Sequence, residues 1–361
     1  MRELLSGNAP LFLAVGGLCI GFLFGAVVFK TNYCAMGSLS DIYNFADYRR
    51  FRAWLLAAAT ALFGAQLLQS LGIAALEKSM YLTPTLNWAG HSLGGIIFGI
   101  GMVFAGGCPS RNLARAGAGD LRSLLTLVVL GLTAYVTIGG LLGPLRALLE
   151  RSTAVTLPLP GQGLGHLLAA VLPTTPTAAE LVAAAVVVGS ALIYCASDKG
   201  FRASPVHIVS GLAVGACVIA GWALTGLAFD ELAPRPVQPL SLTYVRPTGD
   251  AIEWLARFTA EPVPSFGVTS VFGALLGAFA AATAAGRFRL VGFSDTGDML
   301  RNLGGATLMG IGGVLALGCT VGQGITGVST LAIGSLLTFA AIVVGGFWGL
   351  RLLERTLLDA N

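Results

Sequence analysis

The feature this chain most conspicuously lacks is charge, since Asp, Glu, Lys and Arg together supply only 11% of its 361 residues. A soluble domain carries about 25% of these residues, so an ordinary water-facing surface is excluded. Hydrophobic residues make up 55% of the chain. The composition therefore indicates a protein that faces lipid. With no long linker in the sequence, we expect residues 1–361 to form a single polytopic, all-α membrane domain.

Cysteine, histidine and basic runs are also scarce, and each scarcity excludes a class of function. Six cysteines in a chain of this length are too few for a disulfide scaffold. Three scattered histidines lack the spacing of metal ligands, so no metal site is expected. The formal net charge is only +4 and no basic run is present, which argues against nucleic acid as a partner. Three of the cysteines lie within apolar segments and are expected to be buried free thiols: Cys19, Cys195 and Cys217.

Two decapeptides, Gly99–Cys108 and Gly310–Cys319, repeat each other. Seven of their ten positions are identical, and each copy ends an apolar stretch at a cysteine. The likeness continues downstream, where Ser-Leu-Leu-Thr begins at Ser123 in one half and at Ser335 in the other. Internal repeats with broken helices at one central site are typical of transporters. The repeat therefore predicts two facing cysteine loops at the centre of the membrane domain.

Hydrophobic segments predict about nine membrane-embedded helices. A helix needs about 20 apolar residues to cross a bilayer, and the two segments that end at the repeated cysteines are short and glycine-rich. These two are therefore predicted to be discontinuous helices. The residues before the first segment, Met1–Asn8, form no basic n-region and no cleavage site of a signal peptide, so this segment is expected to be a membrane span. The segments are 11–29, 53–76, 92–107, 123–149, 179–196, 206–229, 267–285, 303–318 and 333–353.

Lys and Arg residues set the expected orientation. The connections 30–52, 197–205 and 286–302 carry them and are expected in the cytoplasm, whereas 152–178 and 230–266 are expected outside. This places the N-terminus outside, which is the periplasm in a bacterial inner membrane, and the C-terminus in the cytoplasm. The two Gly-Ile-Gly segments then run antiparallel. The pattern predicts an inverted repeat, with a first unit at about 10–150 and a second at about 179–353.

The residues after each repeated cysteine favour a helix start. Pro109 follows Cys108, and proline is common in the first helical turn; Thr320 follows Cys319, and threonine is a capping residue. The N-terminal end of a helix binds anions, so two such ends facing one another indicate an anionic substrate. The expected pathway also includes the preceding glycines and a nearby amide, namely Gly107, Gly318 and Gln323.

The thiols narrow the class of anion. A neutral thiol is a weak hydrogen-bond donor on a soft sulfur, which suits an anion with an exposed, charge-bearing sulfur better than it suits sulfate. A third cysteine, Cys34, follows the first span in a similar polar setting, where a role in the core and a role in the pathway remain equally open. Arg111 and Arg115 flank the first loop; they either steer anions toward it or anchor the cytoplasmic side. Simple helix packing remains the alternative for Cys108 and Cys319.

Three stretches of sequence resemble the YeeE/YedE family of bacterial sulfur transporters. The segment Leu308–Gly327 resembles the family signature, Gly99–Asn112 its earlier copy, and Asn32–Gly37 its first cysteine region. The resemblance covers most of the chain, although 230–266 gives no support for it. It implies a transporter and not an enzyme, with no cofactor, that imports thiosulfate across the bacterial inner membrane.

The same resemblance implies a role for three residues and a partner. Cys34, Cys108 and Cys319 would hand the ion along an hourglass pathway by S–H contacts to its terminal sulfur. A small cytoplasmic sulfur-carrier protein of the TusA/YeeD type would receive sulfur after uptake. Three alternatives stay open at this stage: transport of another sulfur or selenium species, a general anion channel, and a membrane thiol–disulfide relay of the DsbD/CcdA kind. A reversible disulfide between Cys108 and Cys319 would favour the relay.

Overall fold

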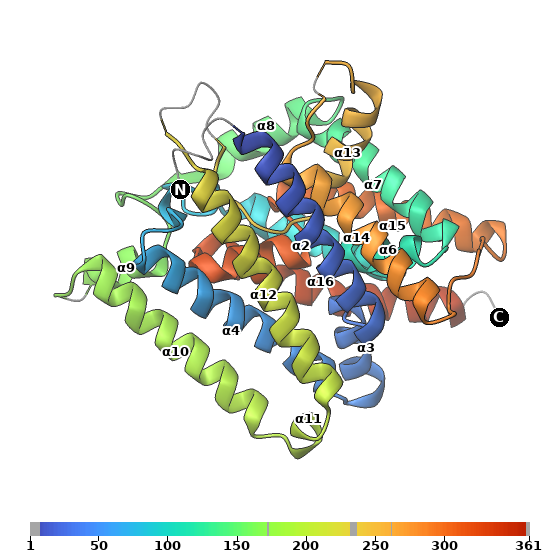
Figure 1. Ribbon diagram of the computed structural model, residues 1–361, viewed down its shortest axis with the longest axis horizontal. Helices are drawn as coiled ribbons and strands as arrows, with labels where there is room; N and C mark the ends of the chain where they lie inside the picture. The colour runs from blue at the N-terminus through green and yellow to red at the C-terminus, as the bar shows by residue number, and fades with distance from the viewer. Residues whose placement is uncertain (1–7, 172, 232–236, 261, 359–361) are drawn as a thin grey trace.

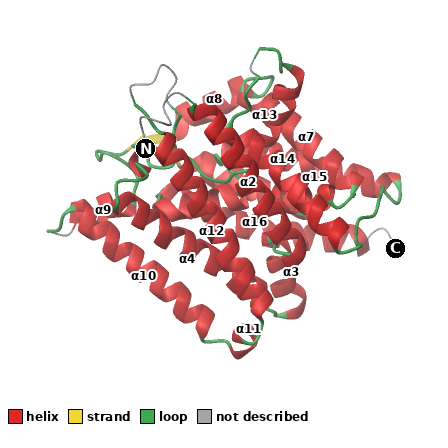
Figure 2. Cartoon of the chain, in the orientation of Figure 1, coloured by secondary structure: helices red, strands yellow, loops and turns green. Residues whose placement is uncertain are grey.

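The protein is an all-α integral membrane protein, as the composition predicts. The computed structural model describes residues 8–171, 173–231, 237–260 and 262–358. Helices dominate this part of the chain, and the strands form a single small ribbon (Figure 2). Within it, eight helical stretches are long and apolar enough to cross a membrane: Ala9–Phe45, Arg49–Ser70, Gly90–Gly117, Leu121–Ile138, Pro176–Ala196, Pro205–Ala228, Phe266–Ala284 and Ile333–Thr356.

The elements of the first half lead up to and follow the first cysteine loop. In chain order they are α2 (Ala9–Thr31), α3 (Ala35–Phe45), α4 (Arg49–Ser70), η1 (Leu76–Lys78), β1 (Thr85–Asn87), η2 (Gly90–Gly94), α5 (Gly95–Phe104), α6 (Pro109–Gly117), α7 (Leu121–Ile138) and α8 (Gly143–Thr153). The strand β1 pairs antiparallel with β2, and Thr85 lies opposite Thr156.

The second half carries the other cysteine loop between α15 and η3. Its elements are β2 (Ala154–Thr156), α9 (Leu164–Val171), α10 (Pro176–Ala196), α11 (Lys199–Arg202), α12 (Pro205–Ala228), α13 (Arg246–Ala256), α14 (Phe266–Ala284), α15 (Thr296–Leu315), η3 (Gly322–Gly327), η4 (Val328–Thr330) and α16 (Ile333–Leu358). Figure 1 shows α10 at the edge of the bundle, joined through α11 to α12.

Polar side chains fix the starts of the helices around the cysteine loops. The Asp120 carboxylate accepts hydrogen bonds from the backbone N–H groups of Arg122 and Ser123 at the start of α7. Asp295 caps α15 in the same way by accepting from the N–H of Asp298. Such caps satisfy N–H groups that have no partner inside the helix. They define where the chain can turn between one membrane segment and the next.

Small residues let the central helices approach closely. Methyl carbons added at Gly101 and Gly312 would lie 2.7 Å from the backbone nitrogen of Met309 and the backbone oxygen of Gly94, respectively. Gly94, just before α5, meets Gly312 late in α15, whereas Gly101 late in α5 meets the earlier Met309, so the two helices pack antiparallel. Tight packing through glycine is a common way for membrane helices to associate. The two Gly-Ile-Gly segments thus run in opposite directions, as the charge pattern predicts.

One sequence-based boundary is wrong, and one segment correctly predicted as a helix does not qualify as a membrane span. The segment 123–149 is not one helix, because α7 ends at Ile138 and α8 starts at Gly143 after the pair Gly139–Gly140. The segment 303–318 belongs to α15, which is not among the eight stretches that pass as membrane spans in the described part of the chain. The first turns of α15 contain Asp298 and Arg301, which lower its apolar character. The count of about nine spans is therefore eight by this criterion.

The connection 230–266 is not simply an external loop. Residues 232–236 and 261 lie outside the described residues, but 237–245 run back along α12 as an extended segment: Thr225 Oγ1 donates to the Leu240 carbonyl at 2.7 Å, and Ser241 Oγ donates to the Val218 carbonyl at 2.7 Å. Leu242 and Tyr244 are fully buried. Non-helical backbone is tolerated inside a membrane protein where protein surrounds it. We call residues 237–245 the re-entrant segment.

Candidate functional site

Each of the three cysteines singled out by the sequence stands directly before a helix. Cys34 is the N-cap of α3, Cys108 is the N-cap of α6, and Cys319 precedes the helical turn that begins at Thr320. The Cys34 sulfur accepts the N–H of Gly37 at 3.3 Å, and the Cys319 sulfur accepts the N–H of Gly322 at 3.3 Å. All three thiols are buried, and all six cysteines of the chain are free. Each of the three sulfurs thus lies at the positive end of a helix.

The loops before Cys108 and Cys319 have the same backbone shape. Gly106 and Leu317 adopt left-handed φ values of 68° and 57°, and Gly107 and Gly318 follow with φ of 157° and 159°. A methyl carbon added at Gly107 would lie 3.0 Å from Arg111 Cγ, and one at Gly318 would lie 3.1 Å from Gln323 Cγ. A left-handed leucine is strained by about 1–2 kcal/mol. The repeat is therefore one of loop geometry as well as of sequence.

An amide four residues after each cysteine holds its loop. Asn112 Nδ2 donates to the Gly107 carbonyl at 2.8 Å, and Gln323 Nε2 donates to the Ala316 carbonyl at 2.7 Å. The oxygens of both amides are buried without a hydrogen-bond partner. Gln323 thus holds the second cysteine loop and Asn112 is its counterpart in the first half, while the expected place of Gln323 in the pathway stays a prediction.

The structure brings the predicted residues together in a row. The Cys34 and Cys108 thiols lie side by side, and the Thr320 side chain lies beside Cys108. Because Thr320 is the neighbour of Cys319 in the chain, it links the second loop to the first. Ser110 Oγ also lies 3.2 Å from the Cys108 sulfur.

Two tyrosines extend this row at its ends, and the sequence analysis missed both. Tyr33 is buried against Cys34 and Cys108, while Tyr244 from the re-entrant segment is buried against Cys319. Tyr33 adjoins Cys34 in the sequence, and that position could have indicated it. Tyr244 stands in a short run, Leu240–Val245, in which apolar residues alternate with Ser241 and Thr243. Such a run is the available signal for a buried segment.

Unsatisfied polar atoms gather around the cysteines. Among the described residues, buried side-chain atoms with no hydrogen-bond partner include the hydroxyls of Tyr33, Tyr244 and Thr320, next to the two amide oxygens described above. Leaving a buried polar group unpaired costs about 1–3 kcal/mol, and such groups call for a water or a ligand. A cavity of about 10 Å³ beside Thr320 and Ala35 has room for no more than about one water. The site is therefore polar and nearly closed.

Arg111 and Arg115 differ in their surroundings. Arg111 is partly buried and interacts electrostatically with the nearby Cys34 and Cys108. No carboxylate of the described residues forms an ion pair with it. Arg115 pairs with Asp120 at 2.6 Å and donates to the Gly106 carbonyl at 3.1 Å. The charge of Arg115 is therefore balanced within the protein, whereas Arg111 presents its charge beside two thiols.

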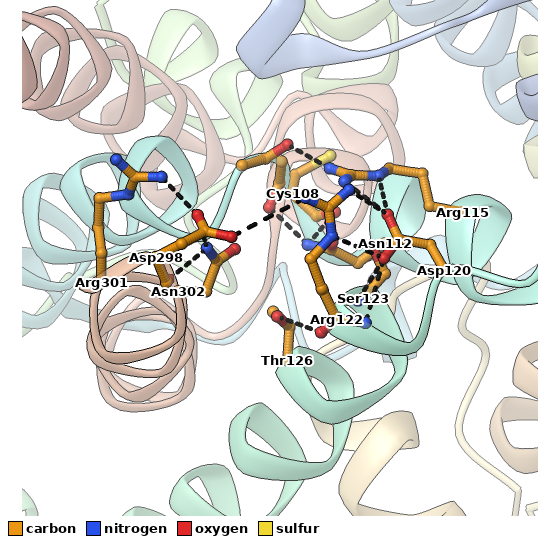
Figure 3. Close-up of polar contacts among 12 residues, drawn as sticks. Cys108, Asn112, Arg115, Asp120, Arg122, Ser123, Thr126, Asp298, Arg301 and Asn302 are labelled. Carbon is orange, nitrogen blue, oxygen red and sulfur yellow. Dashed lines mark hydrogen bonds and ion pairs between the residues drawn. The ribbon is translucent and has the colours of Figure 1, made fainter. Parts of the chain in front are cut away.

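A polar network ties the first cysteine loop to α15 (Figure 3). Asp120 accepts from both Arg115 and Arg122, and Asp298 accepts from Arg301 at 2.5 Å and lies 3.9 Å from Arg122. Burial raises the pKa of the Asp120 carboxyl, but hydrogen bonds and charges from Arg122 and Arg115 outweigh it and hold that pKa below its usual value. The carboxylate thus remains charged and braces the start of α7.

These features define a class: a multi-pass membrane protein in which two antiparallel broken segments, each carrying a cysteine at a helix start, meet in a buried polar site. The sequence pattern of the Sulphur transport family matches residues 30–348. Because the match spans most of the chain, the protein belongs to this family, and the resemblance to YeeE/YedE proteins is confirmed.

Two relatives narrow the comparison. The chain is 29% identical to the thiosulfate transporter TsuA of Spirochaeta thermophila, over 92% of this chain and 96% of the relative. It is 28% identical to the thiosulfate transporter TsuA of Escherichia coli, over 87% of each. Family and relatives together indicate a transporter concerned with sulfur compounds.

Proposed function

We propose that this protein takes up thiosulfate across the bacterial inner membrane along the row Cys319, Thr320, Cys108 and Cys34. The single observation that carries the proposal is the triple placement of a buried thiol at a helix start. Helix N-termini favour a negative charge, and the thiols supply soft S–H donors. The names of the two relatives support the choice of thiosulfate. The predicted orientation puts the N-terminus in the periplasm and the C-terminus in the cytoplasm.

Thiosulfate matches this set of donors because its terminal sulfur is exposed and bears negative charge. A neutral thiol donates its S–H to that sulfur, while the helix end stabilises the charge without a buried cation. Thr320 offers a hydroxyl between the second and first loops, so the ion is never without a donor as it passes. Beside Cys108 and Cys34, Arg111 provides a further attraction for the anion on the inner side. A small cytoplasmic sulfur carrier of the TusA/YeeD type would then receive the sulfur.

Replacement of Cys319 by serine tests the proposal. Cys319→Ser keeps a small donor but removes the soft sulfur, so we expect thiosulfate uptake to fall at least about ten-fold, the order of a lost charged hydrogen bond. Uptake of radiolabelled thiosulfate into cells of a sulfur-auxotrophic host, at matched expression, gives the measurement. The matched control is Cys195→Ser, because Cys195 is buried near the end of α10 and donates to the Arg52 carbonyl at 3.3 Å, a bond that serine retains.

Competition experiments check the substrate. Excess sulfate should leave uptake unchanged, and excess unlabelled thiosulfate should abolish the signal. Equal uptake by Cys319→Ser and Cys195→Ser would remove the thiol from the mechanism. A disulfide formed during turnover would instead support a thiol–disulfide relay, for which the adjacent thiols of Cys34 and Cys108 are the pair to examine by alkylation.

A further inference from the structure

A second polar site lies away from the cysteines. A cavity of about 620 Å³ opens where the end of α4, the start of α10 and the end of α12 converge. Its lining includes Gln66, Gln69 and Glu180. The Oε1 atom of Gln69 is buried there without a hydrogen-bond partner. In the predicted orientation this cavity faces the periplasm.

Glu180 is connected to the segment that follows Cys319. Gln66, only 6% exposed, donates through Nε2 to the Glu180 carboxylate at 3.3 Å and to the Ser329 carbonyl at 3.4 Å. Ser329 lies in η4, directly after the π-helical turn η3, and its hydroxyl accepts from Trp222 Nε1 at 3.0 Å. One amide therefore bridges the carboxylate in the cavity to the chain that carries the second cysteine loop.

In the part of the chain that the structure describes, the charge of the Glu180 carboxylate has no cation paired with it. Its charged and titratable neighbours are His166 from α9 and Glu77 from η1, and no ion pair to Glu180 occurs among the described residues. The nearby Lys78 is paired with Glu231 at 2.8 Å. On α4, which packs against α10, the arginines Arg49, Arg50 and Arg52 stand at the opposite end. An ionisable residue within a membrane helix is a candidate functional site by default, and Glu180 has a hydrogen bond from Gln66 but no ion pair among the described residues.

A fixed negative charge in an outer cavity opposes the uptake of a divalent anion. It repels the anion, and it also holds Gln66 against η4. When a proton from the outer water bonds to one carboxylate oxygen, the repulsion disappears and the bond from Gln66 weakens. Moving negative charge inward against an inside-negative potential is itself unfavourable. Binding a proton outside while the anion binds offsets both effects.

We propose that Glu180 is a proton-binding site whose occupancy favours binding of the transported anion at the Cys319 loop. The proposal rests on the proposed function, because it names the ion that accompanies the anion. By linkage, the two ligands strengthen each other by the same factor. The apparent affinity for thiosulfate therefore rises as the external pH falls.

The first test measures the KM for thiosulfate in proteoliposomes with equal pH on both sides, at values from about 5.5 to 8, a range that covers the titration of partly buried carboxyl groups. The wild-type KM is expected to rise about five- to ten-fold across the range, as for typical couplings. Glu180→Gln keeps an acceptor for Gln66 and should give a flat profile at the low-pH value. The control is Glu77→Gln, which removes an exposed acid from the same cavity but leaves Glu180 in place, so its KM should still rise as the pH rises even if the pH of the rise differs from that of the wild type. A wild-type profile in Glu180→Gln overturns the proposal, as does a flat wild-type profile with measurable flux.

A second readout does not depend on transport. Infrared difference spectra between low and high pH should show the C=O band of a protonated carboxyl in the wild type, reduced by one group in Glu180→Gln. Absence of that difference overturns the proton site. If the wild-type protein transports no thiosulfate at any pH but still shows the infrared band that Glu180→Gln lacks, the proposed function is refuted and the proton site is not. If Glu180→Gln does not fold, Glu180→Asp, which retains a carboxyl group, is used in its place. The proposal then requires that its infrared band and the pH dependence of its KM both shift from those of the wild type.

Discussion

Two neighbouring glycines of α15 provide a sharp test of the helix contact that holds the cysteine loops. Gly305 is buried, and a methyl carbon added there would lie 2.7 Å from the Gly101 carbonyl oxygen and against the Ala105 nitrogen. Gly304 is exposed, and a methyl carbon added there meets nothing within 4 Å. The two substitutions are chemically identical and adjacent. Only the packing differs.

The two substitutions are expected to change the free energy of unfolding in opposite directions. Non-bonded carbon atoms in contact lie at least about 3.5 Å apart, so Gly305→Ala must move α5 and α15 apart by ~1 Å. Overpacking of this kind costs about 1–3 kcal/mol, which is a factor of roughly 5–150 in the unfolding equilibrium. Gly304→Ala removes a flexible glycine from a helix and should gain up to about 1 kcal/mol.

Denaturant titration in detergent micelles, followed by circular dichroism, measures the free energies of unfolding, and thiosulfate uptake at matched expression measures function. We expect Gly305→Ala to lose both stability and uptake, because the displaced helices end at Phe104 and Leu315, next to the two cysteine loops. Gly304→Ala should keep both. Equal behaviour of the two variants would show that the close approach of α5 and α15 is unnecessary, and the reasoning would fail.

Three further predictions concern charge and topology. Arg111→Gln should lower the rate of thiosulfate uptake to a similar extent at low and high salt, because the side chain is partly buried beside Cys34 and Cys108; a loss confined to low salt would make it an entrance residue. Asp120→Asn should lower the melting temperature at neutral pH. Because the pKa of Asp120 in the folded protein is depressed, the difference in melting temperature from wild type should persist above the usual carboxyl pKa near 3.8 and fade as the pH drops through the lower folded pKa. A difference in melting temperature that grows toward acid pH would contradict this prediction. A reporter fused at the C-terminus should lie in the cytoplasm, and one inserted after Thr174 should lie in the periplasm; finding both on the same side would refute the predicted orientation. An insertion at Thr243 should instead disrupt folding, because the re-entrant segment is buried there.

The sequence contained enough to predict the fold class and the cysteine loops. The apolar segments mark the helices, and the repeated Gly-Cys motif marks the two breaks, because the same glycines permit the same backbone. Charge placement also predicted that the two copies run antiparallel. Whether Cys34, Cys108 and Cys319 form a transport pathway stays a prediction, although their positions at helix starts agree with it.

Other parts of the site were beyond reach of the sequence. The burial of Tyr244 depends on a loop that folds back along α12, and its hydrogen bonds to Val218 and Thr225 join residues that no local pattern connects. The neutralisation of Arg115 by Asp120 likewise required knowing how the chain turns between α6 and α7. Long-range contacts of this kind are set by packing, which periodicity does not encode.

The pairing of α2 with α14 has a consequence for how the protein is made. The two helices run parallel, since positions Gly17, Gly21 and Gly25 of α2 face Phe266, Ser270 and Ala274 in the same order. About 235 residues of chain separate the end of α2 from the start of α14, so at a synthesis rate of ~5–20 residues per second the first helix waits roughly 12–50 s for its partner. During that time its row of glycines borders lipid or the insertion machinery. Assembly of the bundle, including the α2 surface at Phe24 that packs against Tyr244 of the re-entrant segment, is therefore completed only after most of the chain has been inserted.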